Sequence, residues 1–211
     1  YHAIPALSSS GIKKLLISSQ DFWKWSWFNE DKDEDNKTTA LNVGSAYHKR
    51  ILEGRDAFND TYAVKPECDR RTKEGKAIYA NFKAQYPDAK EIDEKLKGYI
   101  EAAAHRIETK PNLSKYFSGG KTEVSITWND PHTNVPMKAR LDCINGDTIV
   151  DLKTFSNPSG KPLRKLITSH IAHYNYYTQA AVYTEAAKQA GLDIKKFVFF
   201  FQQSGRENNS V

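Results

Sequence analysis

The sequence has few cysteines and no long apolar run. Its 211 residues include two cysteines, Cys68 and Cys143, which excludes a disulfide framework and a four-cysteine zinc or iron–sulfur site. Such sparing use of cysteine suits a reducing cytoplasm. No apolar run approaches the ~20 residues of a transmembrane helix, and the first residues lack the pattern of a signal peptide. We therefore expect a cytoplasmic protein that does not associate with a membrane.

Acidic residues are fewer than basic ones and are unevenly placed. Lys and Arg number 31 against 26 Asp and Glu, which gives a net charge of +5 and is a mild indication of a polyanionic partner. Residues 29–36 concentrate the acids, and we expect a solvated loop there, because Asn36 stands where a calcium-binding loop needs glycine. The sequence begins at Tyr1 and ends soon after an apolar stretch, so we expect it to be part of a longer chain.

Hydrophobic periodicity divides the chain into a helical part and a part rich in strands. We expect one domain over residues 1–211, with a mainly helical segment at 1–118 and a β-β-β-α-β core at 119–205. This order predicts an α/β fold with a mixed sheet flanked by helices. The main predicted helices are 39–53, 88–109 and 163–190, and the predicted strands are 121–128, 135–144, 147–155 and 195–203.

Two aspartates and a lysine lie in the second and third of these strands. Asn145-Gly146 is typical of a two-residue hairpin turn, and such a turn would pair Asp142 with Ile149. Because side chains alternate along a strand, Asp142, Asp151 and Lys153 would then share one face. The two carboxylates would be diagonal neighbours, with Cα atoms ~7–8 Å apart. They could therefore meet on one Mg²⁺.

The first predicted strand adds a third acid. If Trp128 pairs with Val135, Glu123 lies opposite Arg140 on the face that carries the aspartates. The other face would form the core: Val124, Ile126, Trp128, Val135, Met137, Ala139, Leu141, Val150 and Leu152. An alternative is a solvated polar face with cross-strand ion pairs, each worth only ~0.2–1 kcal/mol. The strands alone leave both interpretations open.

Asp142, followed by Asp151-Leu152-Lys153 on the next strand and then by a helix, resembles the core of PD-(D/E)xK nucleases. The predicted α-β-β-β-α-β order is similar to the fold of that group. Within it, the chain resembles the RecB-like and RecE-like exonucleases of the exodeoxyribonuclease VIII type. Gly44–His48 resembles their G-x-x-x-H helix, and Gln179–Tyr183 resembles their Q-x-x-x-Y segment. A serine-rich opening helix around Ser9 and a basic loop at 70–76 are also similar.

The resemblance implies a metal site built on these residues. Asp142 and Asp151 would be the principal Mg²⁺ ligands, with Glu123, His48 and the Leu152 carbonyl completing the site. Mn²⁺ should substitute, because a histidine is less usual around Mg²⁺. The residue Lys153 would orient or deprotonate the attacking water, or neutralise charge on the phosphorane.

Further residues would support the site or contact DNA: Gln179, Tyr183, Arg70, Arg71, Lys73, Lys76 and Ser9. Each has a plainer interpretation. His48 could be a core histidine, Gln179 and Tyr183 could serve helix packing, and the basic loop could simply be solvated.

The resemblance implies a Mg²⁺-dependent exonuclease that degrades linear duplex DNA ends 5′ to 3′ in recombination, repair or phage recombination. It further implies a homo-oligomeric ring, a single-strand annealing protein as partner, and the cytoplasm of a bacterium, with a bacterial or phage gene. Alternatives are a RecB-type or CRISPR-associated nuclease of other polarity, a catalytically silent DNA-binding module, and a structural domain. Metal-dependent turnover would distinguish the nucleases from the other two.

Overall fold

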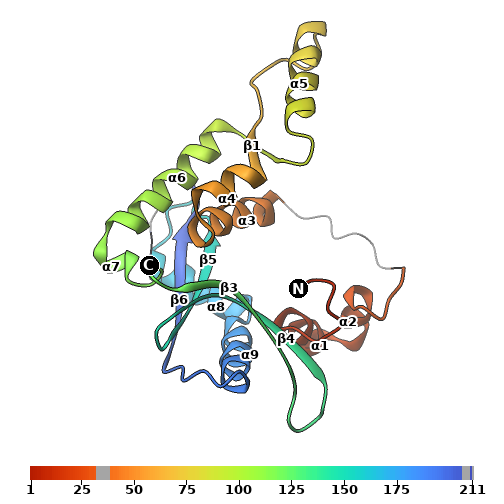
Figure 1. Ribbon diagram of the computed structural model, residues 1–211, viewed down its shortest axis with the longest axis vertical. Coiled ribbons are helices and arrows are strands. Elements are labelled where there is room, and N and C mark those ends of the chain that lie inside the picture. Colours follow the sequence, from red (N-terminus) through yellow and green to blue (C-terminus); the bar gives the residue numbers. More distant parts are fainter. Residues whose placement is uncertain (32–38, 206–209, 211) are drawn as a thin grey trace. The chain divides into compact units, whose positions relative to one another are not determined.

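The computed structural model describes residues 1–31, 39–205 and 210 (Figure 1). Most of the acidic stretch at 29–36 lies outside these residues. The chain forms two compact units, and each is described by itself. The first comprises Tyr1–Lys37, Tyr116–Leu152 and Asn157–Phe201, and the second comprises Thr38–Lys115, Lys153–Ser156 and Gln202–Val211. Whether they act as the single domain expected from the sequence stays a prediction.

A four-stranded sheet is the framework of the first unit. Its strands lie in the order β3 (Lys121–Asn129), β4 (Pro136–Asn145), β5 (Thr148–Phe155) and β6 (Lys196–Gln203), and β5 and β6 end in residues of the second unit. β3, β4 and β5 are antiparallel neighbours. β6 runs parallel to β5, since backbone bonds join Lys196 to Asp147 at one end and Ser204 to Phe155 at the other. The predicted α/β fold with a mixed sheet is confirmed.

Both predicted hairpin registers are wrong by two residues. Ile144 pairs with Ile149, and Trp128 pairs with Met137. Asn145 pairs with Thr148, so the β4–β5 turn is Gly146-Asp147, with the positive φ of 59° at Gly146. Because the side-chain period of a strand is two, a slip of two residues exchanges partners but keeps each side chain on its predicted face.

The predicted core is partly confirmed. Ala139, Leu141, Val150 and Leu152 are fully buried, but Val135, at 38% exposed, is not a core residue because it lies just before β4 begins. Ile149 and Asp151 on the opposite face of β5 are also fully buried. β5 is therefore covered on both faces, as central strands of α/β sheets are, and Asp151 does not lie on a solvated face.

Helices α1 (Ser9–Ile17), α2 (Ser19–Trp25), α8 (Leu163–His173) and α9 (Tyr176–Gln189) belong to the first unit. The prediction of one helix over 163–190 is wrong. Asn175 takes the left-handed conformation (φ 49°, ψ 49°) and separates α8 from α9. α9 packs on the sheet through a cluster of buried side chains: Val182, Tyr183, Ala186 and Ala187 with Ala139, Leu141 and Ile149.

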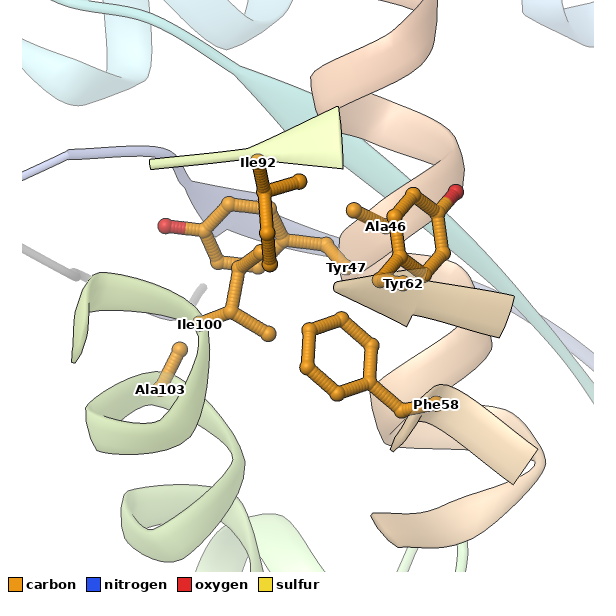
Figure 2. Packing of buried hydrophobic residues seen from close by; sticks show 7 residues of the cluster. All are labelled: Ala46, Tyr47, Phe58, Tyr62, Ile92, Ile100 and Ala103. Carbon is orange, nitrogen blue, oxygen red and sulfur yellow. The ribbon is translucent and has the colours of Figure 1, made fainter. Parts of the chain in front are cut away.

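The second unit is mainly helical. It contains α3 (Thr39–Leu52), α4 (Gly54–Thr61), β1 (Tyr62–Val64), α5 (Lys73–Gln85), β2 (Lys90–Ile92), α6 (Glu94–Thr109) and α7 (Pro111–Ser114). Its core joins α3, α4, β1, β2 and α6, and Phe58 and Ile100 point toward one another in Figure 2.

The predicted helix over 88–109 is wrong at its start. Residues 90–92 pair with β1 as the parallel strand β2, and the helix begins only after Asp93, whose side chain accepts from the Leu96 amide at 2.7 Å. Among the described residues, no helix is long and apolar enough to cross a membrane.

Gly44 lies where a larger residue has no room. A Cβ added to it would come within 2.9 Å of the Thr154 hydroxyl, whereas one added to Gly98, also inside a helix, would meet nothing within 4 Å. Gly44→Ala should therefore be less stable than Gly98→Ala by ~1–3 kcal/mol, the usual cost of overpacking. Replacing glycine by alanine inside a helix gains ~1 kcal/mol in helix propensity, and this gain cancels because both variants have it. Urea unfolding of both variants measures the difference, and equal stabilities would contradict the close packing.

Candidate metal centre

Glu123 on β3 and Asp142 on β4 lie opposite each other at the centre of this site. The ladder pairs Thr122 with Cys143 and Val124 with Leu141, so Glu123 and Asp142 are the residues between these two pairs. An oxygen of one carboxylate lies within 4.8 Å of an oxygen of the other. The third acid inferred from the sequence therefore does meet Asp142.

Glu123 has a backbone conformation that is rare for a glutamate. Its φ is 55°, in the left-handed region, although the residue lies within a strand. A left-handed residue other than glycine costs ~1–2 kcal/mol and leaves the ladder incomplete at this point. Such strain is concentrated at functional sites, where the surrounding structure maintains it.

Asp142 is held by the backbone of the neighbouring strand. Its Oδ2 accepts a hydrogen bond of 2.7 Å from the Leu152 amide. The β4–β5 ladder ends at the pair of Cys143 and Val150. If the ladder continued, the Leu152 amide would donate to the Leu141 carbonyl. It donates to the Asp142 carboxylate instead. A bond from an amide to a carboxylate is stronger than one to a neutral acceptor, and it fixes the side chain. The predicted role of the Leu152 carbonyl as a ligand stays a prediction.

Asp151 is fully buried, and α9 holds it. Its Oδ1 accepts from the Gln179 Nε2 at 2.8 Å. Tyr183 lies one turn further along α9 and is buried. Burial is the main reason that the pKa of its phenol is raised, and the charges of Asp151 and Asp142 raise it further. Tyr183 therefore stays protonated at neutral pH. The structure thus brings Gln179 and Tyr183 to the aspartates.

Arg140 forms an ion pair with Glu123. The register expected from the sequence placed Arg140 directly opposite Glu123. In the observed register Arg140 pairs with Ser125, two residues before Asp142 on β4 and therefore on the same face of the strand. Arg140 holds a positive charge against Glu123, so a metal ion that binds Glu123 would compete with it.

Lys153 and His48 belong to the second unit. Lys153 is half-buried and follows Asp151 by two residues on β5, so alternation along the strand keeps the two on one side. His48 is half-buried on α3, one turn after Gly44. Their roles stay predictions.

The basic loop has partners of its own. The Arg70 guanidinium lies 4.6 Å from the centre of the Tyr79 ring, and Arg71 pairs with Asp69 at 3.0 Å. Lys73 and Lys76 are exposed at the start of α5. Two of the four predicted DNA contacts are therefore engaged within the protein, which leaves the contact of the loop with DNA a prediction.

Ser9 is buried in the first turn of α1. The preceding residue, Ser8, caps this helix by accepting from the Gly11 amide at 3.3 Å. The serine-rich opening helix expected from the sequence is therefore present, while the supporting role of Ser9 stays a prediction.

Two left-handed residues, Glu123 and Asn175, were not expected from the sequence. Nothing about a glutamate between Thr122 and Val124 indicates a left-handed backbone. Asn175 is different, because asparagine tolerates that conformation better than most residues. An Asn between aromatic residues is therefore a sequence signal for a break in a predicted helix.

Comparison with known families agrees with this geometry. The sequence matches DUF3799, described as a PDDEXK-like domain of unknown function, over residues 8–208. The chain belongs to this family. This DUF3799 domain is therefore a member of the PD-(D/E)xK nuclease superfamily. A search of curated proteins found no match. Its fold is similar to the crystal structure of a "Putative exonuclease" from Eubacterium rectale, at 22% identity and a TM-score of 0.58, covering 94% of this chain and 67% of that one.

The carboxylates of this DUF3799 domain fit a divalent cation. Two ligands on one Mg²⁺, at bonds of ~2.0–2.1 Å, lie at most about 4 Å apart. The oxygens of Glu123 and Asp142 lie within 4.8 Å of each other, so a small side-chain adjustment suffices. Carboxylate oxygens suit Mg²⁺ and Mn²⁺.

Proposed function

We propose that this protein is a metal-dependent exonuclease that degrades linear duplex DNA from its ends, 5′ to 3′, as the RecE-like resemblance implies. The observation that best supports the proposal is the close pair of Glu123 and Asp142, which the strained backbone of Glu123 helps to form. A purely DNA-binding surface would favour a positive face and has no need for such a pair.

In this proposal the acids hold the metal and the other residues act on the substrate. Glu123, Asp142 and Asp151 would provide oxygen ligands, and His48 a nitrogen ligand. A bound Mg²⁺ or Mn²⁺ would supply a nucleophile at neutral pH and offset charge on phosphorus. Lys153 would orient or deprotonate the attacking water, while Gln179 keeps Asp151 in place through its amide.

The resemblance also supports partners for this activity. We propose a homo-oligomeric ring around the duplex and a single-strand annealing protein that receives the remaining strand. The basic residues of the 70–76 loop, Lys73 and Lys76 first, would contact phosphates. A bacterial cytoplasm, with a bacterial or phage gene, is the setting that we propose.

Digestion of an end-labelled linear duplex tests the activity and its polarity. The duplex carries its label at either the 5′ or the 3′ end and is incubated with Mg²⁺, with Mn²⁺ or with EDTA. We expect early release of 5′-labelled mononucleotides in Mg²⁺ or Mn²⁺ and none in EDTA. Early release of the 3′ label would indicate a nuclease of the other polarity. Absence of turnover by folded protein with either metal would contradict the nuclease proposal and favour a DNA-binding module.

A further inference from the structure

A group of aromatic side chains lies where α8 ends and α9 begins, the two helices drawn in blue in Figure 1. We call His170, His173, Tyr174 and Tyr176 the tyrosine ledge. The rings of Tyr174 and Tyr176 stack, with their centres 5.6 Å apart and an angle of 24° between their planes. The rings of His170 and His173 contact the Tyr174 ring edge-on, with centres 5.4 and 4.7 Å from the centre of that ring. Tyr174 is 48% exposed, so part of this aromatic surface faces solvent.

A single left-handed residue forms the ledge. Asn175, between the two stacked tyrosines, takes the left-handed conformation and interrupts what the sequence predicts as one helix. In an unbroken helix, residues two apart would point to different sides and could not stack. The broken helix therefore brings the ring of Tyr174 onto the ring of Tyr176.

The ledge lies beside the acidic site. Tyr176 is one turn before Gln179, which binds Asp151. Burial raises the pKa of Tyr176 to about 12, with further contributions from Tyr174 and Asp151. Tyr176 is thus close enough to Asp151 for that charge to raise the pKa of its phenol, which stays protonated at neutral pH. On its inner side Tyr176 contacts Phe199 and Phe201 of β6, which anchor it.

Lys13, together with the basic character of the chain segment that carries the ledge, favours a polyanion. The Lys13 ammonium lies 5.3 Å from the centre of the Tyr176 ring. No acidic residue occurs in the sequence between Asp151 and Glu185, whereas Lys161, Arg164 and Lys165 do. Aromatic rings with nearby cations are the usual surface on which single-stranded nucleic acid binds, by base stacking and phosphate attraction.

We propose that the tyrosine ledge stacks an unpaired base of the DNA strand that passes the acidic site, with Tyr174 as the exposed ring. This proposal rests on the proposed nuclease function and adds a binding site for single-stranded DNA to it. Tyr174 contacts the base, and Tyr176 stacks on the Tyr174 ring and holds it in place. Lys13 attracts the phosphates of the DNA strand.

Binding of a labelled oligonucleotide in EDTA tests the ledge without cleavage. Fluorescence anisotropy is measured with a single strand and with a blunt duplex, for the wild type, Tyr174→Ala and Tyr174→Phe. Loss of one stacked base costs ~5- to ~150-fold in affinity. We expect Tyr174→Ala to weaken single-strand binding by such a factor and to leave blunt-duplex binding unchanged. Tyr174→Phe should bind as the wild type does. The matched control is Tyr86→Ala, which removes an exposed tyrosine of the other unit.

An abasic scan of the same oligonucleotide gives a second, position-specific measurement. One base at a time is removed along the strand. In the wild type, we expect one position to lose affinity by the factor seen for Tyr174→Ala, and in that variant the same position should lose nothing further. This coupling is the signature of direct stacking.

The outcomes separate the two proposals. If the protein digests DNA but Tyr174→Ala binds single strands as tightly as the wild type, the ledge proposal is wrong and the nuclease proposal stands. If Tyr174→Ala changes the oligomeric state on sedimentation without affecting strand binding, the ledge is a protein interface, which also overturns the proposal. If no DNA is bound or cleaved, the nuclease proposal fails as well.

Discussion

Asp142→Asn should reduce metal-dependent hydrolysis of linear duplex DNA by ~10³-fold, because stabilisation by a bound metal is worth several kcal/mol and each ~1.4 kcal/mol is a factor of ten. The substitution removes the charge that would hold the ion beside Glu123. Its amide oxygen can still accept from the Leu152 amide, the hydrogen bond that Asp142 makes at 2.7 Å. The variant should therefore fold. Initial rates on an end-labelled duplex measure the loss.

Two controls isolate this effect. Asp193→Asn removes an aspartate of the same unit whose side chain is 81% exposed, and we expect it to keep the wild-type rate. Calorimetric titration with Mn²⁺ should show weaker binding for Asp142→Asn and none of this loss for Asp193→Asn. An Asp142→Asn protein that is folded and retains the wild-type rate would show that Asp142 is not a metal ligand.

Lys153→Ala should reduce the same rate by ~10²–10⁴-fold, the usual contribution of a positioned proton-transfer group. Metal affinity should not fall, since the carboxylates remain. The loss should appear in the turnover number and less in the affinity for DNA, because the proposed role of Lys153 is on the attacking water. Single-turnover digestion at saturating Mg²⁺ measures it directly.

Comparison with two further variants assigns the role of Lys153. Lys188→Ala removes a lysine that is 76% exposed and should retain full activity. Lys153→Arg keeps a positive charge that does not deprotonate in proteins. Activity restored by arginine would assign the lysine to charge stabilisation, and continued loss would assign it to proton transfer. If Lys153→Ala itself digests DNA at the wild-type rate, the proposed catalytic role is wrong.

Much of the fold follows from local patterns. The three consecutive strands β3, β4 and β5 and the helix with Gly44 and His48 occur close to where alternation, caps and glycines predict them. The strands β1 and β2 were missed because each has only three residues, and their pairing depends on contacts between distant segments. Local propensity carries too little information for such short elements.

The acids were placed on the correct face for a simple reason. Both hairpin registers are displaced by two residues, which matches the period of a strand. The partners differ, however. Glu123 lies opposite Asp142, although the sequence placed it opposite Arg140, and Asp142 binds the backbone of the next strand.

The sequence by itself determined the order of the four strands of the large sheet, the alternation that places the acids and Lys153 on one side, and the motifs of the nuclease superfamily. Only the tertiary structure decided which groups meet: Glu123 with Asp142, and Gln179 with Asp151. It also decided the left-handed backbone of Glu123 and Asn175. The physical reason is that element type depends on nearby residues, whereas strand partners and strained conformations are stabilised by residues far away in the chain.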